Sequence, residues 1–215
     1  GRSLHEQGRY LEAEKQFRQA LKGAKDRTLK SDIYDKLGRS LYKGKKYGEA
    51  VKYFREALKY EKDKNERARI HYRLGRALYK EKKYREAEIH FKEALKYEKD
   101  KNERAWIYYR LGLSLYDQGK YPEADKQYEK ALSLTKDKAL RAWIYYRLGR
   151  SLQKRKKYKE AQKQFSQALK YEKDNNQKAW IYYRLGLSLY EQKKYLKAKS
   201  CYEKALKQTR DKNLH

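Results

Sequence analysis

Hydrophobic residues recur at spacings of three and four along pairs of segments throughout the chain. In residues 31–67, the apolar positions of the first and then the second segment are Ile33, Leu37, Leu41, Ala50, Phe54 and Ala57. This spacing places each set on one face of a helix. A basic stretch, residues 42–47, separates the two sets, so the sequence predicts two helices joined by a short turn. No segment has the alternation that is typical of a strand.

The pair of segments repeats with a constant period of 37 residues. A Leu-Gly pair marks each copy, at Leu37-Gly38, Leu74-Gly75, Leu111-Gly112, Leu148-Gly149 and Leu185-Gly186. A fixed period of this size is typical of a solenoid, in which each copy packs on its neighbours. We therefore expect an all-α fold and a single repeat domain over residues 1–215. Its parts are a partial repeat, 1–30, and the repeats 31–67, 68–104, 105–141, 142–178 and 179–215.

Helix ends are also encoded in the sequence. An aspartate followed three residues later by Glu or Gln predicts a capping box, in which each side chain accepts a backbone N–H bond from the other residue. This spacing occurs at Asp63 and Glu66, Asp100 and Glu103, and Asp174 and Gln177, whereas Asp137 is followed by Leu140. Pro122 falls at the expected start of a second helix, where its missing N–H costs nothing.

Composition narrows the range of partners. The 58 Lys and Arg residues outnumber 29 Asp and Glu residues and give a formal net charge of +29, which suits an anionic partner. The single cysteine, Cys201, excludes an internal disulfide and favours a reducing compartment, so we expect a cytoplasmic location and a buried thiol. No apolar run is long enough to span a membrane. The chain has no Met and opens in mid-repeat, so we expect a fragment of a longer protein.

The repeated positions together resemble the tetratricopeptide repeat. The order is Leu37-Gly38, Tyr47, Ala50, Phe54 and Ala57-Leu58, and it returns in the four later repeats; the first copy keeps Gly1, Tyr10, Ala13, Phe17 and Ala20-Leu21. The period exceeds the usual 34 residues, and Lys62 and Lys99 replace the usual closing proline. We therefore expect the second helix or its following turn to be longer. The resemblance implies a right-handed α-solenoid and a non-catalytic binding scaffold.

The first helix of each repeat separates into two faces. In residues 142–150 and beyond, Ile144, Leu148 and Leu152 form a core arc, while aromatic residues and arginines lie opposite. The resemblance implies that these opposite faces line a concave, ligand-binding groove. The candidate ligand-binding residues are Arg69, Tyr72, Arg73, Arg76, Tyr79, Trp106, Tyr109, Arg110, Tyr116, Trp143, Tyr146, Arg147, Arg150, Trp180, Tyr183, Arg184 and Tyr190. For the three tryptophans, packing between repeats is the competing interpretation.

The sequence shows no catalytic or metal-binding pattern. His5, His71, His90 and His215 lack metal-ligand spacing, and no nucleophile set or phosphate-binding loop is present, so we expect no enzyme activity, cofactor or metal. The leading hypothesis is a scaffold that binds a protein or peptide. The alternative is a basic Tyr/Arg groove that holds an anionic polymer, nucleic acid or a phosphate-bearing polysaccharide, for a catalytic domain elsewhere in the parent chain. Self-association through open solenoid ends is a third hypothesis.

Lysines in the turn inside each repeat bear on that alternative. They are Lys43, Lys45 and Lys46, Lys80, Lys82 and Lys83, Lys154, Lys156 and Lys157 with Arg155, and Lys193 and Lys194. As solvated surface they need no ligand, but as a ladder repeated along the chain they form a basic ridge that concentrates an anionic polymer.

Overall fold

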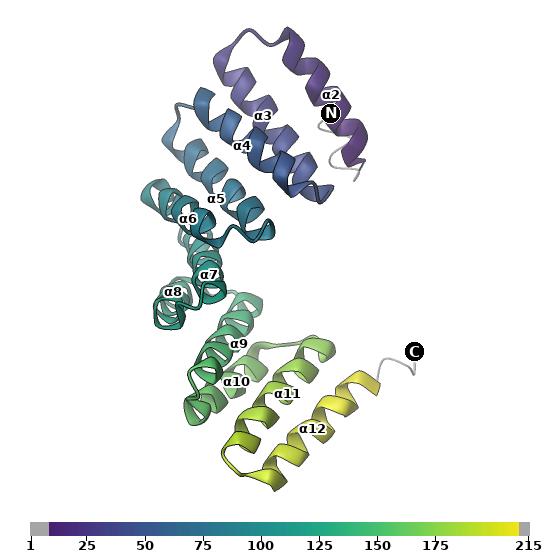
Figure 1. Cartoon of the computed structure of the whole chain (residues 1–215), viewed down its shortest axis with the longest axis vertical. Coiled ribbons are helices and arrows are strands. Elements are labelled where there is room, and N and C mark those ends of the chain that lie inside the picture. The colour runs from purple at the N-terminus through teal and green to yellow at the C-terminus, as the bar shows by residue number, and fades with distance from the viewer. Residues whose placement is uncertain (1–8, 211–215) are drawn as a thin grey trace. The chain divides into compact units, whose positions relative to one another are not determined.

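The computed structural model describes residues 9–210, which form eleven α-helices and no strand (Figure 1). The helices are α2 (Tyr10–Gly23), α3 (Arg27–Lys43), α4 (Tyr47–Tyr60), α5 (Lys64–Lys80), α6 (Tyr84–Tyr97), α7 (Lys101–Asp117), α8 (Tyr121–Leu134), α9 (Lys138–Lys154), α10 (Tyr158–Tyr171), α11 (Asn175–Glu191) and α12 (Tyr195–Arg210). The expected all-α, helix–turn–helix repeat is confirmed. Gly1, His5 and His215 lie outside the described residues.

The two helices of each repeat differ in length. From α3 to α11 the first helices have 17 residues and the second helices have 14. The turn after α4 is three residues long, from Glu61 to Asp63. Within each of these repeats the first helix is therefore the longer of the two, and the turn that follows the second helix is short. That the second helix or its following turn is longer than in the usual 34-residue repeat stays a prediction.

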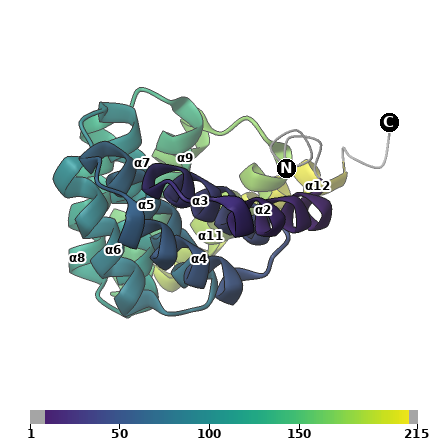
Figure 2. The ribbon, with the colours of Figure 1, turned by 90° about the horizontal axis from the view of Figure 1, so that it is seen from above.

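The chain divides into two compact units, Gly1–Gln118 (unit 1) and Gly119–His215 (unit 2). Within each unit, helices that follow one another in the chain pack together. In unit 1, for example, α2 lies beside α3 when seen from above (Figure 2). The boundary falls between α7 and α8, inside the repeat 105–141, and the single repeat domain over residues 1–215 stays a prediction.

The core of each hairpin is built on a glycine that faces an aromatic ring. A Cβ atom added at Gly75 would lie 2.8 Å from the Phe91 ring, and one added at Gly149 would lie 2.6 Å from the Phe165 ring. Both phenylalanines are fully buried. The absence of a side chain on the first helix thus admits the ring from the second helix, as the Leu-Gly pattern predicts.

The aspartate caps form, but only half of the predicted capping box is present. The side chain of Asp63 accepts hydrogen bonds from the backbone N–H groups of Asn65 and Glu66, each at 2.9 Å. The backbone N–H of Asp63, however, donates to Glu61 at 2.9 Å and not to Glu66. The backbone N–H groups of Asp100 and Asp174 likewise donate to the glutamate two residues before them, Glu98 and Glu172. At Asp137 the acceptor is the Thr135 hydroxyl, so that cap has a partner as well.

The turns inside the repeats place non-glycine residues in the left-handed region. Lys45, Lys82, Lys156 and Lys193 have φ values between 59° and 62°, and Gly119 has a φ of 79°. At Lys82, for example, the turn closes with hydrogen bonds from Lys82 N to Tyr79 O and from Lys83 N to Leu78 O. Such a φ is costly for residues other than glycine, so each of these lysines carries local strain.

Pro122 and Cys201 lie in the environments that the sequence predicts. Pro122 lies in the first turn of α8, and Cys201 is buried, with a pKa raised by that burial. Both agree with the sequence analysis. Along residues 9–210, no helix has both the length and the apolarity that crossing a membrane requires.

Candidate functional site

The core arc of the first helices is buried, as the periodicity predicts. Ile144, Leu148 and Leu152 of α9 are buried, as expected. The equivalent residues on α5, Ile70, Leu74 and Leu78, are buried too. The candidate residues lie opposite this arc, although the rings of Tyr72 and Tyr146 also pack against the buried Phe91 and Phe165.

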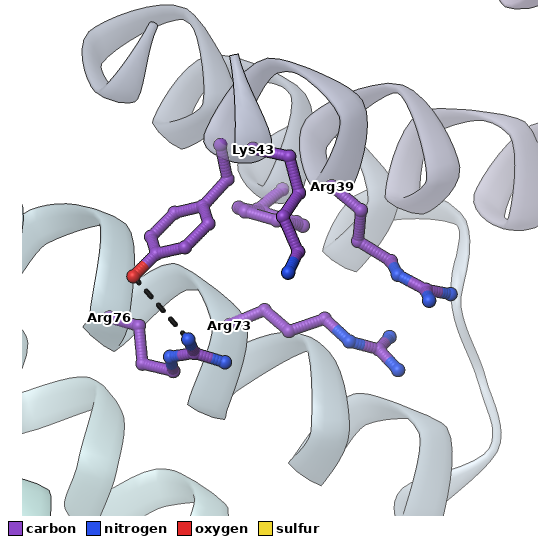
Figure 3. A pocket seen from close by; sticks show the side chains of 6 residues that line it. Arg39, Lys43, Arg73 and Arg76 are labelled. Carbon is purple, nitrogen blue, oxygen red and sulfur yellow. Dashed lines mark hydrogen bonds between the residues drawn. The ribbon is translucent and has the colours of Figure 1, made fainter. Parts of the chain in front are cut away.

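On this face of unit 1, a cavity of about 210 Å³ lies between α3 and α5. Its lining residues are Arg39, Tyr42, Lys43, Phe54, Arg73 and Arg76, and we call it the basic cavity. Arg39 and Lys43 extend from α3 and Arg73 and Arg76 from α5, with the Arg39 and Arg73 guanidinium groups directed to the same side (Figure 3). On each helix the charged residues are three or four positions apart, so each pair projects from the same side.

Arg76 is held against aromatic rings on both helices. Its guanidinium carbon lies 5.0 Å from the centre of the Tyr42 ring and 5.6 Å from that of Tyr72. Its Nη2 donates a long hydrogen bond of 3.5 Å to the Tyr42 hydroxyl (Figure 3). Its Nε is buried and has no hydrogen-bond acceptor among the described residues. Arg76 is therefore positioned by cation–π contacts and keeps donor capacity for a ligand.

Arg73 is positioned by a buried carboxylate. Its Nη1 donates to Asp35 Oδ2 at 2.8 Å. Burial raises the pKa of Asp35, while the charge and the hydrogen bond of Arg73 oppose that rise. Asp35 Oδ1 is buried without a hydrogen bond in the described part of the chain. Asp35 thus orients Arg73 and compensates one positive charge.

The basic cavity has an excess of positive charge. Four cationic side chains line it, and Asp35 supplies one negative charge, which leaves three positive charges uncompensated. Arg39 and Lys43 are exposed and form no hydrogen bond or ion pair with any residue from 9 to 210. Like charges gathered in one cavity repel each other, so the arrangement favours an anionic occupant.

Sequence reasoning identified only part of this site. Arg73 and Arg76 were candidates, but Arg39, Tyr42 and Asp35 were not, and Lys43 was assigned only to the turn. One signal was available for Asp35, because the other repeats have tyrosine at that position. Those equivalents are Tyr72, Tyr109, Tyr146 and Tyr183.

The other candidates of unit 1 lie outside the cavity lining. Arg69 is exposed and paired with Glu66, and the Tyr79 hydroxyl donates to Asp117. Tyr72 packs against the buried Phe91 ring, and its own ring lies beside Arg76.

On α7, aromatic candidates turn inward. Tyr109 and Tyr116 are each only 6% exposed. Trp106 is half-buried and contacts the Tyr109 ring edge-on, and the Arg110 guanidinium lies 5.9 Å from that ring. Tyr109 and Tyr116 therefore offer little surface to a ligand.

Unit 2 exposes aromatic side chains on the equivalent face. Trp143 is 40% exposed, Trp180 57% and Tyr183 41%. Trp180 contacts Tyr183 edge-on, and the guanidinium of Arg184 lies 5.9 Å from the Tyr183 ring. Of the two interpretations of the tryptophans, the exposure of Trp143 and Trp180 favours a surface role.

The remaining candidates of unit 2 surround this aromatic surface. Tyr190 is exposed, and Tyr146 packs against Phe165. Arg150 lies 6.0 Å from the centre of the Tyr146 ring, and Arg147 is half-buried.

Unit 2 does not reproduce the set of residues that forms the basic cavity. Three repeats further on, the positions of Arg39, Tyr42, Lys43, Arg73 and Arg76 hold Arg150, Gln153, Lys154, Arg184 and Leu187. Gln153 Nε2 donates to the Arg184 carbonyl oxygen and to the Ser188 hydroxyl, each at 2.9 Å. Unit 2 thus has one cation fewer at these positions.

Unit 1 also contains a histidine pair that the sequence spacing did not reveal. The Nδ1 atoms of His71 on α5 and His90 on α6 are 3.0 Å apart, and the rings are stacked. Burial and the neighbouring His90 lower the pKa of His71 to about 4, and burial lowers the pKa of His90 as well. No described group of three or more potential ligands is placed to hold a metal ion.

Comparison with known protein families identifies the type of repeat in the chain. Sequence models of the tetratricopeptide repeat match residues 1–60 and 103–174, residues 36–103, and residues 179–212. No curated protein has significant sequence similarity to the chain.

Solved structures share the fold at low sequence identity. BtubC from P. vanneervenii is 18% identical with a TM-score of 0.80, and the match covers 96% of this chain and 90% of that one. MamA from Desulfovibrio magneticus RS-1 is 20% identical with a TM-score of 0.73, covering 85% and 96%. YrrB, described as a TPR protein with an unusual peptide-binding site, is 19% identical with a TM-score of 0.68, covering 91% and 93%. From its repeats and from the models that match them, this chain belongs to the tetratricopeptide repeat family.

Proposed function

We propose that the chain is a protein-interaction scaffold whose first-helix faces bind an acidic segment of a protein partner. The observation that carries the proposal is the basic cavity on α3 and α5, where three positive charges lack a counter-charge. Arginine donates in a fixed fork to carboxylates, so Arg39, Arg73 and Arg76 suit acidic groups of a peptide.

The exposed aromatic residues of unit 2 support a peptide ligand. Trp180 and Tyr183 present large apolar surfaces next to Arg184. Tryptophan, tyrosine and arginine are enriched among the residues that contribute most to binding energy at protein interfaces. YrrB is described as having a peptide-binding site, which lends the proposal support by analogy.

Peptide display tests this function. The chain is immobilised, peptides of random sequence are selected on it, and their affinities are measured by fluorescence anisotropy at two salt concentrations. We expect peptides rich in Asp and Glu, whose affinity falls as salt rises. The double variant Arg39→Ala with Lys43→Ala should weaken them about tenfold, because two unpaired cations are lost.

A matched double variant serves as the control. Lys62→Ala with Lys99→Ala removes the same amount of charge from exposed turns between repeats, and it should leave the affinity within about twofold. An equal loss in both double variants would show a non-specific charge effect and contradict the proposal. So would tighter binding of a single-stranded oligonucleotide that displaces the selected peptides, because this outcome favours the anionic-polymer alternative.

A further inference from the structure

We propose that the basic cavity binds the phosphate group of a phosphorylated side chain in the protein partner. This inference rests on the proposed function and names the chemistry of the group that the cavity takes.

Charge balance favours a phosphate monoester over a carboxylate. The cavity has three uncompensated positive charges, those of Arg39, Lys43 and Arg76, once Arg73 is paired with Asp35. A carboxylate brings one negative charge, whereas a phosphate monoester brings about 1.5 to 2 at pH 7 and three strong acceptor oxygens. The dianion therefore neutralises more of the repulsion among the lining residues.

The donors surround the space on two sides. Figure 3 shows the Lys43 ammonium group between the side chains that rise from α5 and the helix α3 above it. Arg73 and Arg76 approach from α5, and the buried Nε of Arg76 has no acceptor within the described chain. Planar guanidinium forks from opposite sides, with an ammonium point charge between them, match the distributed acceptors of a phosphate.

The size of the cavity is consistent with one phosphate group and the start of the side chain that carries it. Its volume is about 210 Å³. The Tyr42 and Phe54 rings also line it and provide apolar surface. A phosphorylated side chain would bring both an anionic group and the apolar carbons next to it.

The set of cations that lines the cavity does not continue onto α7. Arg69, on the same helix as Arg73, is neutralised by Glu66. On α7, the position equivalent to Lys43 holds Asp117, and the position equivalent to Arg76 on α5 holds Leu113. A polymer with many phosphates needs a series of uncompensated cations. A single phosphate needs only one such cavity, which is what α3 and α5 provide.

Degenerate peptide libraries with a fixed central residue test the inference. Libraries of nine-residue peptides carry phosphoserine, phosphotyrosine, glutamate or serine at the centre, and binding to the full chain is measured by anisotropy. We expect one of the phosphorylated libraries to bind at least tenfold more tightly than the glutamate library. The preference should shrink between pH 7.5 and pH 5.5, because the second phosphate pKa is about 6.

Arg76→Leu is the variant that locates the site. Two other repeats have leucine at this position, Leu113 and Leu187, so the helix accepts it. The variant should retain its helicity and thermal midpoint but lose the preference for phosphate at least fivefold. A control that removes an exposed arginine from a second helix, Arg85→Leu on α6, should keep the preference.

The outcomes separate this inference from the proposed function. Equal binding of the phosphorylated and glutamate libraries would overturn the phosphate inference and leave an acidic-peptide scaffold. Binding of none of the anionic libraries would overturn both. An unchanged preference in Arg76→Leu would place phosphate recognition elsewhere, and competition by inorganic phosphate at the same concentration as the peptide would indicate a free-anion site. Each of these two results would also contradict the inference.

Discussion

The α3 and α5 face of unit 1 and the α9 and α11 face of unit 2 are built on the same repeat but have different chemistry. The first gathers four cations around a cavity with a single compensating carboxylate, Asp35. The second exposes Trp143, Trp180 and Tyr183. In both units, the buried Gly-aromatic contact that holds the hairpin is nearly the same. The shared packing is thus separated from most of the positions at which the two faces differ.

This separation has a structural cause. Packing fixes one arc of each first helix, which carries the Leu-Gly pair, and the second helix covers it. The positions opposite this arc vary more among the repeats, even though the rings of Tyr72, Tyr146 and Tyr183 contact Phe91, Phe165 and Tyr202 on the second helix of their own hairpin. If the comparison is correct, substitutions in the core should act alike in both units, and substitutions on the faces should act differently.

The largest expected effect is at the shared core. Phe91→Ala in unit 1 and Phe165→Ala in unit 2 each remove a fully buried ring that packs against a glycine. Each should lower the free energy of unfolding by about 3–5 kcal/mol. Urea unfolding followed by circular dichroism measures both. Costs that differ by more than about 2 kcal/mol would show that the two hairpin cores are not equivalent.

The histidine pair should make unit 1 more sensitive to acid. The pKa of His71 is lowered from 6.5 to about 4, chiefly by burial, then by His90 and Arg67. A lowered pKa means that the folded state favours neutral histidine. Its contribution to stability is therefore complete above pH 6.5 and is lost as pH falls toward 4. The full shift corresponds to about 3.4 kcal/mol, and solvent screening of a half-exposed ring reduces this to about 1.5–2 kcal/mol.

The pH dependence is measured against a variant with residues from another repeat. His71→Tyr with His90→Gln installs the pair that unit 2 has at Tyr145 and Gln164. The difference in unfolding free energy between pH 7 and pH 4.5 should be smaller in this variant than in the original chain. If both proteins lose the same stability, the acid sensitivity comes from groups shared by both, such as Glu93, whose pKa is lowered chiefly by its hydrogen bond with Lys96.

The sequence predicts most of the fold, because the fold depends on a pattern that recurs. The Leu-Gly period, the aspartate caps and Pro122 fix helix positions through local rules, and all three are found in the structure. The predicted acceptor of the Asp63 backbone N–H, Glu66, was wrong. Glu61, two residues before Asp63, accepts this hydrogen bond instead. Periodicity also gave no indication that contacts divide the chain between α7 and α8.

The binding face is less predictable, because it depends on contacts between repeats. Helical periodicity shows that Arg73 and Arg76 lie opposite the core, but it does not show that Arg39 from another repeat faces them. Nor does it distinguish Tyr109, which is buried, from Tyr183 at the same repeat position, which is exposed. The His71–His90 contact likewise joins two helices at a separation of 19 residues, and no metal-binding spacing signals it.

Transfer of the basic cavity residues to unit 2 should make the two faces more alike. Leu187→Arg with Gln153→Tyr gives α9 and α11 the four cations and the tyrosine of α3 and α5. In a chain that also carries Arg76→Leu, we expect this change to restore binding of the preferred phosphorylated library about tenfold, which is about 1.4 kcal/mol. Failure to restore it, in a variant with unchanged helicity, would indicate that Asp35, which unit 2 replaces with Tyr146, is needed to orient the arginine.

The smallest effect is expected in turns, where the two units should again behave alike. Lys82 in unit 1 and Lys156 in unit 2 have φ values of 59° and 60°. A left-handed φ costs about 1–2 kcal/mol for a residue with a Cβ atom, while glycine loses about 0.5–1 kcal/mol more chain entropy on folding. Lys82→Gly and Lys156→Gly should therefore each stabilise the fold by about 0.5–1 kcal/mol in urea unfolding. Gly119, at the equivalent turn position in the repeat between them, shows that glycine fits this turn.

The same two glycine variants also test whether the lysines in these turns contribute to peptide binding. If lysine is present at these positions only as solvated surface, the glycine variants gain stability and keep their affinity for the selected acidic peptides. If the turns contribute to binding, each variant gains stability but loses affinity, and the loss grows at low salt because exposed charges are screened less there. Destabilisation by glycine would contradict the strain argument itself, since it would mean that the lysine side chain contributes more to the turn than its backbone conformation costs.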